Sequence, residues 1–278
     1  MLHVRTRPEL SRVAVLGLGA IGQTLVDRLL DGVTFPSPPS LLVYVKAYQI
    51  DELTTRYAKH IQLTTSLDEL ISFAPDVIVE AAGQSAVREL AEPILAAGHD
   101  LMLVSTGALV DDELRLRLSA TASSSGARML IPAGAIAGLD GLGALRYSSD
   151  LRVRYVSVKP PNAWRGTPAE ADIDLDTVRS AVTFFRGSAA EAATRFPRNA
   201  NLAATIALAG AGLERTVVEL VADPGASGNR GWFEAEGELG RLTVELSGPS
   251  MSTNAKTSAV TAYSILHALE NMDRTIVI

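Results

Sequence analysis

Residues 14–22 read Ala-Val-Leu-Gly-Leu-Gly-Ala-Ile-Gly, and the helical pattern of Gln23–Leu30 follows them directly. An apolar strand therefore leads through a glycine-rich turn into a helix. In such a turn the first glycine makes the tight bend, the second lets the backbone approach a pyrophosphate, and the third lets the helix pack closely on the strand. The amide groups and the dipole at the helix start favour phosphate. The stretch predicts a dinucleotide site formed by Gly17, Gly19, Ala20, Ile21 and Gly22.

Composition narrows the classes of protein to which the chain can belong. With 278 residues it can bury a sizeable core and form two domains. It has no cysteine, which excludes disulfides, thiolate nucleophiles and Cys-ligated metal sites, and we expect no metal site. A net charge of −6 without a basic run argues against a nucleic-acid partner. No apolar stretch is long enough to span a membrane and residues 1–8 lack an apolar signal region, so we expect a cytoplasmic protein without a membrane partner.

From Ser11 to about Ile131, short apolar and β-branched runs alternate with helical patterns. This alternation is typical of βαβ units and predicts a parallel sheet. The predicted strands are Val13–Leu16, Leu41–Val45, Ile61–Leu63, Val77–Glu80, Leu101–Ser105 and Met129–Ile131. The predicted helices start near Ala20, Asp51, Ser66, Ser85, Asp111 and Leu139.

Past about Asp150 the pattern changes to alternating stretches that predict half-buried antiparallel strands. These strands are Val153–Val158, Trp232–Ala235 and Leu242–Leu246, with a hairpin turn between the last two. Helices are predicted at Asn201–Gly210 and Lys256–Leu269, followed by a strand at Thr275–Ile278. We expect the last helix to pack on the first domain. The predicted fold class is α/β, a Rossmann-type doubly wound parallel sheet with an inserted α+β domain of mainly antiparallel strands. Residues 1–138, completed by 250–278, form the dinucleotide-binding domain, and 139–249 form a substrate and dimerisation domain.

Turns of small residues follow the fourth, fifth and sixth predicted strands: Glu80–Gln84, Ser105–Ala108 and Pro132–Gly138. Ligands of an open parallel sheet lie outside the carboxyl ends of its strands. Small side chains there let a flat cofactor lie against the backbone, so we expect Ala82 and Gly83 to contact it. The alternative is that small residues only permit tight strand-to-helix turns.

The second predicted strand lacks the acidic residue that usually binds the adenosine ribose hydroxyls about 20 positions past the glycines. Lys46 stands near that place. A cation there can accommodate a 2′-phosphate, which favours NADP slightly over NAD, although a solvated lysine at a strand end explains it equally well. The cofactor is therefore expected to be NAD or NADP.

Several motifs besides the glycine turn occur in order along nearly the whole chain. They are Val79–Glu89, Asp100–Leu109, Pro132–Asp140, Lys159–Pro161, Gly187–Ala192, Phe196–Asn201, Ala222–Pro224 and Asn254–Ser258. In these motifs the chain resembles the L-aspartate dehydrogenases. The resemblance implies a Rossmann protein with an inserted α+β domain, usually a homodimer, that oxidises L-aspartate to iminosuccinate with NAD or NADP. The partner would then be a small molecule, an amino acid or its imine or keto acid.

The resemblance also implies roles for two residues. Ala135 would meet the cofactor through its backbone amide, and Asn201 would contact it near the nicotinamide. Both roles fit the residues themselves, because Ala135 lies in a small-residue turn at a strand end and Asn201 opens a predicted helix. The alternative is that Asn199 and Asn201 only cap the helix.

At one position the chain departs from the family. The family's catalytic histidine lies in a motif of Asn, any residue, then His, and the corresponding stretch here is Asn229–Gly231, with Gly231 in place of the histidine. Removing a positioned acid or base typically lowers the rate about 10²–10⁴-fold. The four histidines, which are His3, His60, His99 and His267, are expected to be structural or solvated.

Lys159, at a predicted strand end before two prolines, is the candidate for binding a substrate carboxylate or titrating near neutrality, the alternative being a surface lysine. Lys256 is expected to position substrate or to cap the last helix. Trp232 either narrows the pocket beside the lost histidine or lies in the core. Three functions stay open: a dehydrogenase or imine reductase with aspartate as the default substrate, a related oxidoreductase with a changed substrate, and a dinucleotide-binding protein with weak catalysis.

Overall fold

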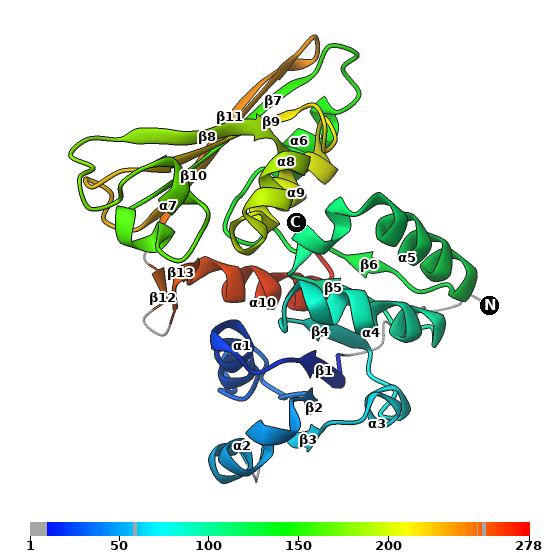
Figure 1. Cartoon of the computed structure of the whole chain (residues 1–278). Helices are drawn as coiled ribbons and strands as arrows, with labels where there is room; N and C mark the ends of the chain where they lie inside the picture. The colour runs from blue at the N-terminus through cyan, green and yellow to red at the C-terminus, as the bar shows by residue number, and fades with distance from the viewer. Residues whose placement is uncertain (1–9, 58–59, 249, 252–253) are drawn as a thin grey trace. The chain divides into compact units, whose positions relative to one another are not determined.

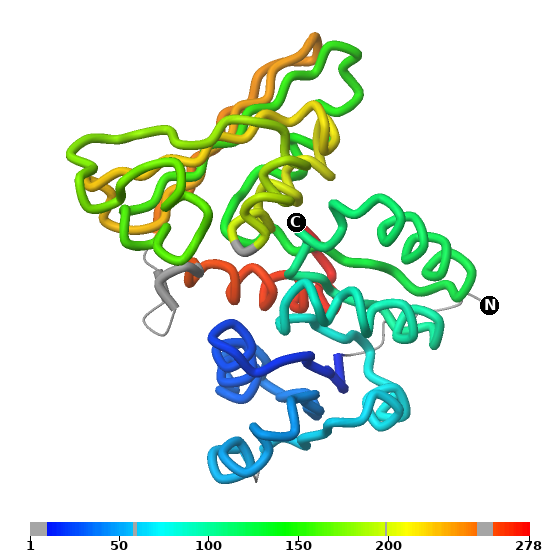
Figure 2. Tube along the Cα trace, viewed as in Figure 1, coloured from blue at the N-terminus to red at the C-terminus, as the bar shows by residue number. Residues whose placement is uncertain are grey.

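The computed structural model describes residues 10–57, 60–248, 250–251 and 254–278, without the side chains of 198, 250–251 and 254–257. The chain divides into two compact units (Figure 1). Unit 1 comprises Met1–Ser105, Glu113–Pro132 and Ala262–Ile278, and unit 2 comprises Thr106–Asp112 and Ala133–Thr261. The chain enters unit 2 twice, after Ser105 and after Pro132, and the trace in Figure 2 can be followed through both places.

Unit 1 contains a six-stranded sheet in the order β3-β2-β1-β4-β5-β6, and all of its pairings are parallel. This is the strand order of a dinucleotide-binding doubly wound sheet, whose order reverses between the strands numbered 1 and 4. Each of the six predicted strands is confirmed to within a residue or two. Their bounds are Arg12–Leu16 (β1), Ser40–Tyr44 (β2), Gln62–Thr64 (β3), Val77–Glu80 (β4), Leu101–Leu103 (β5) and Met129–Leu130 (β6).

Helices connect these strands and supply much of the apolar core of unit 1. The serine predicted to start a helix, Ser66, caps one, because its hydroxyl accepts a hydrogen bond from the amide of Glu69 at 3.3 Å. The last helix contributes Ile265, Leu266 and Leu269 to the core around β1, as predicted. The helices are α1 (Ala20–Leu29), η1 (Ala47–Gln49), α2 (Ile50–Tyr57), α3 (Leu67–Ser72), α4 (Gln84–Ala96), α5 (Asp112–Ser125) and α10 (Val260–Asp273).

Two predictions for the end of the chain are wrong. Asn254–Ser258 is not the start of a helix but strand β13, paired with β12 (Ser250–Met251), and the helix begins only at Val260. Thr275–Ile278 is not a strand, because the described residues offer it no neighbouring strand and its apolar side chains are exposed. β-Branched composition alone was misleading there, since strand propensity acts through packing against neighbours.

Unit 2 is built on a five-stranded sheet in the order β11-β10-β7-β9-β8. The pairing of β7 with β9 is parallel and the other three are antiparallel, so the sheet is mixed but mainly antiparallel. The sequence missed β8 and β9. The strands are Arg152–Lys159 (β7), Val182–Ser188 (β8), Thr216–Ala222 (β9), Asn229–Gly237 (β10) and Gly240–Gly248 (β11). The helices are η2 (Thr106–Val110), α6 (Leu139–Leu145), η3 (Pro161–Trp164), α7 (Ala169–Asp172), α8 (Ala189–Arg195), η4 (Pro197–Asn199) and α9 (Asn201–Ala209).

The two faces of this sheet differ because successive side chains of a strand point to opposite sides. One face, which carries Tyr155 and Phe233, packs with α6, α8 and α9 in the main core of unit 2. The other carries a separate small cluster of Val156, Val158, Val221 and Trp232. Trp232 therefore points away from the face that holds Gly231, and the idea that its ring narrows a pocket at Gly231 is wrong.

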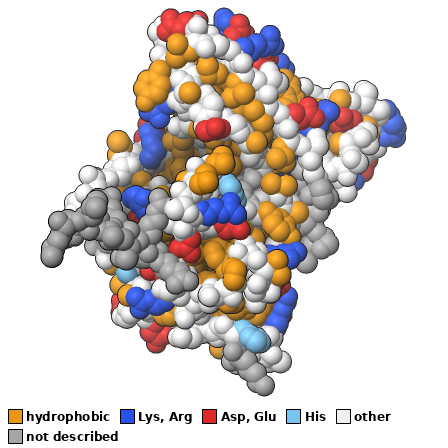
Figure 3. Space-filling model, turned by 180° about the vertical axis from the view of Figure 1, so that it is seen from behind, with side chains coloured by type: hydrophobic (Ala, Val, Ile, Leu, Met, Phe, Trp, Pro, Cys, Tyr) orange, Lys and Arg blue, Asp and Glu red, His pale blue; other side chains and the backbone are white. Residues whose placement is uncertain are grey.

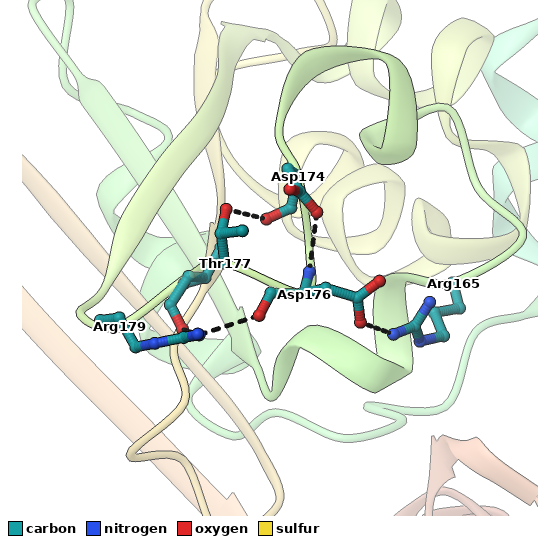
Figure 4. A network of polar contacts seen from close by, with 6 residues as sticks. Arg165, Asp174, Asp176, Thr177 and Arg179 are labelled. Carbon is teal, nitrogen blue, oxygen red and sulfur yellow. Dashed lines mark hydrogen bonds and ion pairs between the residues drawn. The ribbon is translucent and has the colours of Figure 1, made fainter.

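The connection from η3 to β8 is held by local polar contacts. The carboxylate of Asp174 accepts the amide of Asp176 at 3.0 Å, and Arg165 pairs with the Asp176 side chain (Figure 4). The guanidinium of Arg179 donates to the Asp176 carbonyl at 2.8 Å. Because these contacts satisfy the polar groups of a surface segment locally, we assign them a structural role.

The charges on the face drawn in Figure 3 give little indication of a highly charged partner. On the face drawn in Figure 3, Lys and Arg side chains are interspersed with Asp and Glu. The helices of the described residues include none with the length and apolar character needed to cross a membrane.

Candidate functional site

The glycine turn between β1 and α1 has the geometry that its sequence predicts. Gly17 has a φ of +87°, and its amide donates to the carbonyl of Tyr44 at 2.9 Å. A Cβ atom on Gly17 would lie 2.8 Å from the Cα and Cβ atoms of Ala82. A Cβ atom on Gly22 would lie 2.2 Å from the carbonyl oxygen of Gly17. Both positions therefore require glycine for conformation or close packing.

Gly19 is different, because a Cβ atom there would meet nothing within 4 Å. Gly19 is the N-cap residue of α1 and its carbonyl accepts the first helical bond, from Gln23 at 2.8 Å. The amides of the first helical residues, Ala20, Ile21 and Gly22, have no acceptor within their own helix. No acidic residue lies in the first turn of α1. The open space at Gly19, next to helix-start amides that have no acceptor in the helix, suits a pyrophosphate group.

The turn after β4 is held by a buried carboxylate that the sequence did not single out. Glu80 is fully buried, and its Oε1 accepts the amides of Ala82 and Gly83, both at 2.8 Å. The hydroxyl of Ser105 donates to the same oxygen at 2.9 Å, and the Ser105 amide donates to Oε2 at 2.9 Å. Glu80 thus ties the turn that touches Gly17 to the end of β5. The amides of Ala82 and Gly83 are engaged by protein, so any contact they make with a cofactor uses other atoms.

Lys46 is exposed and lies two residues after the end of β2. Its amide donates to the side-chain oxygen of Gln49 at 3.1 Å, which fixes the backbone at the start of η1. The next acidic residue along the chain is Asp51. The carboxyl end of β2 thus presents a cation where a ribose-binding acid usually stands.

In unit 2, a hydrogen-bonded cluster surrounds the start of α9. The hydroxyl of Thr106 donates to the carbonyl of Asn201 at 2.7 Å and lies 2.9 Å from the hydroxyl of Thr205. The side-chain oxygen of Asn201 accepts the amide of Gly107 at 3.0 Å. Asn201 is the first residue of α9 rather than its cap, which is Ala200. The Asn201 side chain therefore anchors η2 to α9.

Leu202 links this helix start to two glycines. A Cβ atom on Gly134 would lie 3.7 Å from one Leu202 methyl group, and a Cβ atom on Gly231 would lie 3.6 Å from the other. Gly134 has a φ of +69° and precedes Ala135, which is half-buried. The structure thus brings the predicted cofactor turn, the start of α9 and the position of the missing histidine together in unit 2.

Polar residues line the helix-covered side of β7. Tyr155, Ser157 and Lys159 alternate along it and are 2%, 5% and 8% exposed. The Lys159 ammonium lies 5.2 Å from the ring centroid of Trp164, so Lys159 is not a surface lysine. Burial raises the pKa of Tyr155 to about 12, although a hydrogen bond from Ser157 opposes the shift. Polar residues at every second position of an otherwise apolar strand are a sequence pattern that could have singled out Tyr155 and Ser157 as site residues.

Two half-buried asparagines in unit 2 each have one buried side-chain atom with no hydrogen-bond partner among the described residues: Nδ2 of Asn199 and Oδ1 of Asn229. Asn229 lies two residues before Gly231 and so on the same face of β10. Buried polar atoms are normally satisfied, and exceptions point to an absent partner such as a ligand or water. A substrate with carboxylate and amino groups would satisfy a donor and an acceptor of this kind.

None of the described histidines belongs to the unit that contains Gly231. His60, His99 and His267 belong to unit 1, and the sequence of unit 2 contains no histidine. His3 lies outside the described residues, as does the side chain of Lys256. Among the residues that are described, no group of three or more His, Cys, Asp or Glu side chains is arranged to hold a metal ion.

The sequence patterns of two known families match the chain. "Aspartate dehydrogenase, C-terminal" matches residues 140–272, and "Homoserine dehydrogenase, NAD binding domain" matches 17–132. L-aspartate dehydrogenase 2 of Bordetella pertussis is 44% identical over 92% of this chain and 94% of its own length. The chain belongs to the L-aspartate dehydrogenase family. Another member, L-aspartate dehydrogenase of Acinetobacter baylyi, is 39% identical over 94% of this chain and 97% of its own.

Solved structures agree with this family. The crystal structure of aspartate dehydrogenase from Thermotoga maritima matches with a TM-score of 0.74 and 26% identity, over 97% of this chain and 99% of that one. A homoserine dehydrogenase from Thiobacillus denitrificans has the same fold, with a TM-score of 0.60 and 15% identity over 95% of this chain and 73% of its own. The chain is thus an oxidoreductase of the NAD(P)-dependent amino acid dehydrogenase type with a Rossmann domain. Its cofactor is a nicotinamide dinucleotide, NAD or NADP.

Proposed function

We propose that this protein oxidises L-aspartate to iminosuccinate, or reduces the imine in reverse. The observation that carries the proposal is the open glycine turn at Gly19, because it provides a dinucleotide site on a family member. The substrate is taken from the activity by which the relatives are named. The bound dinucleotide supplies a hydride acceptor for the carbon that carries the amino group.

Roles for the chain's own residues follow from where each one lies. The amides of Ala20, Ile21 and Gly22 bind the pyrophosphate. In unit 2, Ala135 and Asn201 contact the nicotinamide, a role that the fixed backbone around Asn201 supports. Lys159, held near Trp164, binds a substrate carboxylate. Ala82 and Gly83 line the cofactor beside Gly17.

The test is turnover with both cofactors. Purified protein is incubated with NADH or NADPH, oxaloacetate and ammonia, and absorbance at 340 nm is followed. Loss of absorbance that depends on ammonia is the expected result. No loss with either cofactor would contradict aspartate as the substrate.

A second candidate is a related oxidoreductase with a different amino acid or imine as substrate. Gly231 favours it, because the residue at the family's histidine position bears on the reacting centre. A panel of keto acids with ammonia or amines distinguishes the two, since a better substrate than oxaloacetate would establish the changed specificity. Dinucleotide binding by calorimetry with no turnover on the whole panel would leave a protein that binds the cofactor with little catalysis.

Lys46 is expected to favour NADPH. Substituting Lys46→Ala should weaken NADPH binding about 5–10-fold and leave NADH binding unchanged, because one charge-assisted contact with the 2′-phosphate is lost. Calorimetric titration with each cofactor measures this. Arg117→Ala, which removes a positive charge from α5 of the same unit, is the control and should change neither affinity. Equal NADPH affinities for the parent chain and Lys46→Ala would contradict the role.

We also propose a homodimer formed through the outer face of the unit 2 sheet. Val156, Val158 and Val221 on this face are already buried, so the half-buried Trp232, which packs on them beside the ion pair of Arg154 and Glu219, is the apolar side chain left for a partner to cover. Light scattering should give twice the chain mass of 29.4 kDa, and Trp232→Glu should give the monomer. A monomeric parent protein would contradict this proposal.

The division into a dinucleotide-binding domain of residues 1–138 and 250–278 and a second domain of residues 139–249 stays a prediction. The cytoplasmic location also stays a prediction. The lack of cysteine and the proposed use of a soluble nicotinamide pool support that location.

A further inference from the structure

Unit 2 places a phenol where the proposed reaction lacks an acid. Gly231 on β10 is paired with Ser157 on β7, on the sheet face that also carries Tyr155. A Cβ atom on Gly231 would lie 3.4 Å from both the hydroxyl oxygen and the Cε2 atom of Tyr155. The hydroxyl end of Tyr155 therefore lies next to Gly231, as does Leu202 at the start of α9.

The ring of Tyr155 packs in the core of unit 2, but its hydroxyl end lies on a strand face that also carries polar residues. Ser157 and, further along β7, Lys159 are also buried polar residues on the same face. An all-apolar strand face would be more stable in a core, since a buried polar group is costly unless it is hydrogen-bonded. The unpartnered Oδ1 of Asn229 lies on the neighbouring strand, on the same face.

The protonation state also fits. Even the ordinary pKa of tyrosine, 10, leaves the phenol neutral at pH 7, and burial raises the Tyr155 pKa further, to about 12. A neutral phenol donates a hydrogen bond, which a carboxylate does not.

We propose that the hydroxyl of Tyr155 replaces the missing histidine as the proton donor to the substrate nitrogen, and this inference rests on the proposed function. In the reductive direction the imine gains a hydride at carbon and a proton at nitrogen. The C=N electron pair that moves to nitrogen bonds the proton released by the Tyr155 hydroxyl, and water restores a proton to the phenolate. Oxidation runs through the same bonds in reverse, after the substrate ammonium has lost its first proton to water.

Tyr155→Phe tests the proposal directly. We expect kcat/KM for imine reduction to fall about 100-fold, the typical loss for a removed general acid. The dissociation constant for the dinucleotide and the melting temperature should stay close to those of the parent, because the ring is kept and only the oxygen is lost. The matched control is Tyr57→Phe, whose hydroxyl donates to Asp27 at 2.8 Å and whose pKa burial also raises to about 12. Tyr57 lies in unit 1, and its variant should keep full activity.

Gly231→Ala provides a second variant that does not depend on the stability of Tyr155→Phe. Its methyl group makes only ordinary contacts, at 3.4 Å or more, so the strand should tolerate it. The methyl group would stand against the phenol oxygen, and kcat/KM should fall at least about tenfold with dinucleotide affinity unchanged. If the parent protein turns substrate over and both variants match it, the proposal is overturned while the proposed function stands.

If the parent protein turns nothing over, the proposed function fails and a binding measurement decides the inference. Oxaloacetate is titrated into protein saturated with oxidised dinucleotide, a combination that cannot react. The keto oxygen takes the place of the imine nitrogen as acceptor. Binding that is about tenfold weaker in Tyr155→Phe supports the proposal, because one hydrogen bond is lost. Equal binding by the two proteins, or no binding by the parent, overturns it.

Discussion

Gly22→Ala is expected to abolish dinucleotide binding and to destabilise unit 1. The added methyl group would lie 2.2 Å from the carbonyl oxygen of Gly17, and the backbone cannot yield there as a flexible side chain could. Separating α1 from the turn should lower the free energy of unfolding by about 3 kcal/mol or more. The amides that bind phosphate move with the helix, so affinity is lost together with stability.

Gly19→Ala should separate these two effects. Its φ of −77° suits alanine, and the methyl group would meet no protein atom within 4 Å. Stability should therefore change by less than about 1 kcal/mol, the difference between glycine and alanine at an N-cap. The methyl group would occupy the space through which a pyrophosphate approaches the backbone, and affinity should fall about 10–100-fold.

Thermal melts and calorimetric titration with NADH and NADPH measure both quantities. Gly143→Ala is the control, because Gly143 lies in α6 with open space around its Cβ position and outside the turn. It should leave affinity unchanged. Dinucleotide binding by Gly19→Ala as tight as by the parent protein would show that the pyrophosphate is not bound at this turn.

The fold of unit 1 could be predicted because its signals are local. Most of the strands from β1 to β6 are short apolar runs, although β3 is Gln-Leu-Thr, and the glycine turn by itself indicates a phosphate-binding role. β8 was missed because Phe184, Phe185 and Arg186 do not alternate cleanly, and the strand is irregular between Thr183 and Phe185. β13 was read as helix because only pairing with β12, not local composition, makes it a strand.

The candidate site was harder to predict, because its residues meet only through strand register. Lys159 was found from the prolines that follow it, but its burial near Trp164 depends on the fold. The relation of Tyr155 to Gly231 joins positions on two strands and requires the pairing of β7 with β10. Glu80 was read as one member of a small-residue turn, and its four donors come from two separate segments.

Glu80→Ala is expected to be among the most destabilising single changes in unit 1. The substitution leaves the amides of Ala82 and Gly83 and both donors of Ser105 without their acceptor inside the protein. Each buried unsatisfied group costs about 1–3 kcal/mol, and together with the cavity the loss should reach about 3–5 kcal/mol. Dinucleotide affinity should fall as well, because Ala82 packs on Gly17.

Glu80→Gln is a milder variant, because glutamine has the shape of glutamate and replaces only one of the two accepting oxygens by an NH₂ donor. With its oxygen in the Oε1 position, glutamine still accepts three donors, but its NH₂ group then faces the amide of Ser105. The loss should be smaller than for alanine, about 1–3 kcal/mol. Chemical denaturation measures both variants.

Asp76→Ala is the matched control for the buried carboxylate. Asp76 also accepts two amides and a hydroxyl, from Ser11 and Arg12, but at a site that water reaches. Water can replace the lost acceptor there, so the loss should be about 1 kcal/mol. If Glu80→Ala were no more destabilising than Asp76→Ala, Glu80 would not be the tie between the β4 turn and β5. A large difference would mean that a buried carboxylate holds the turn on which Gly17 packs.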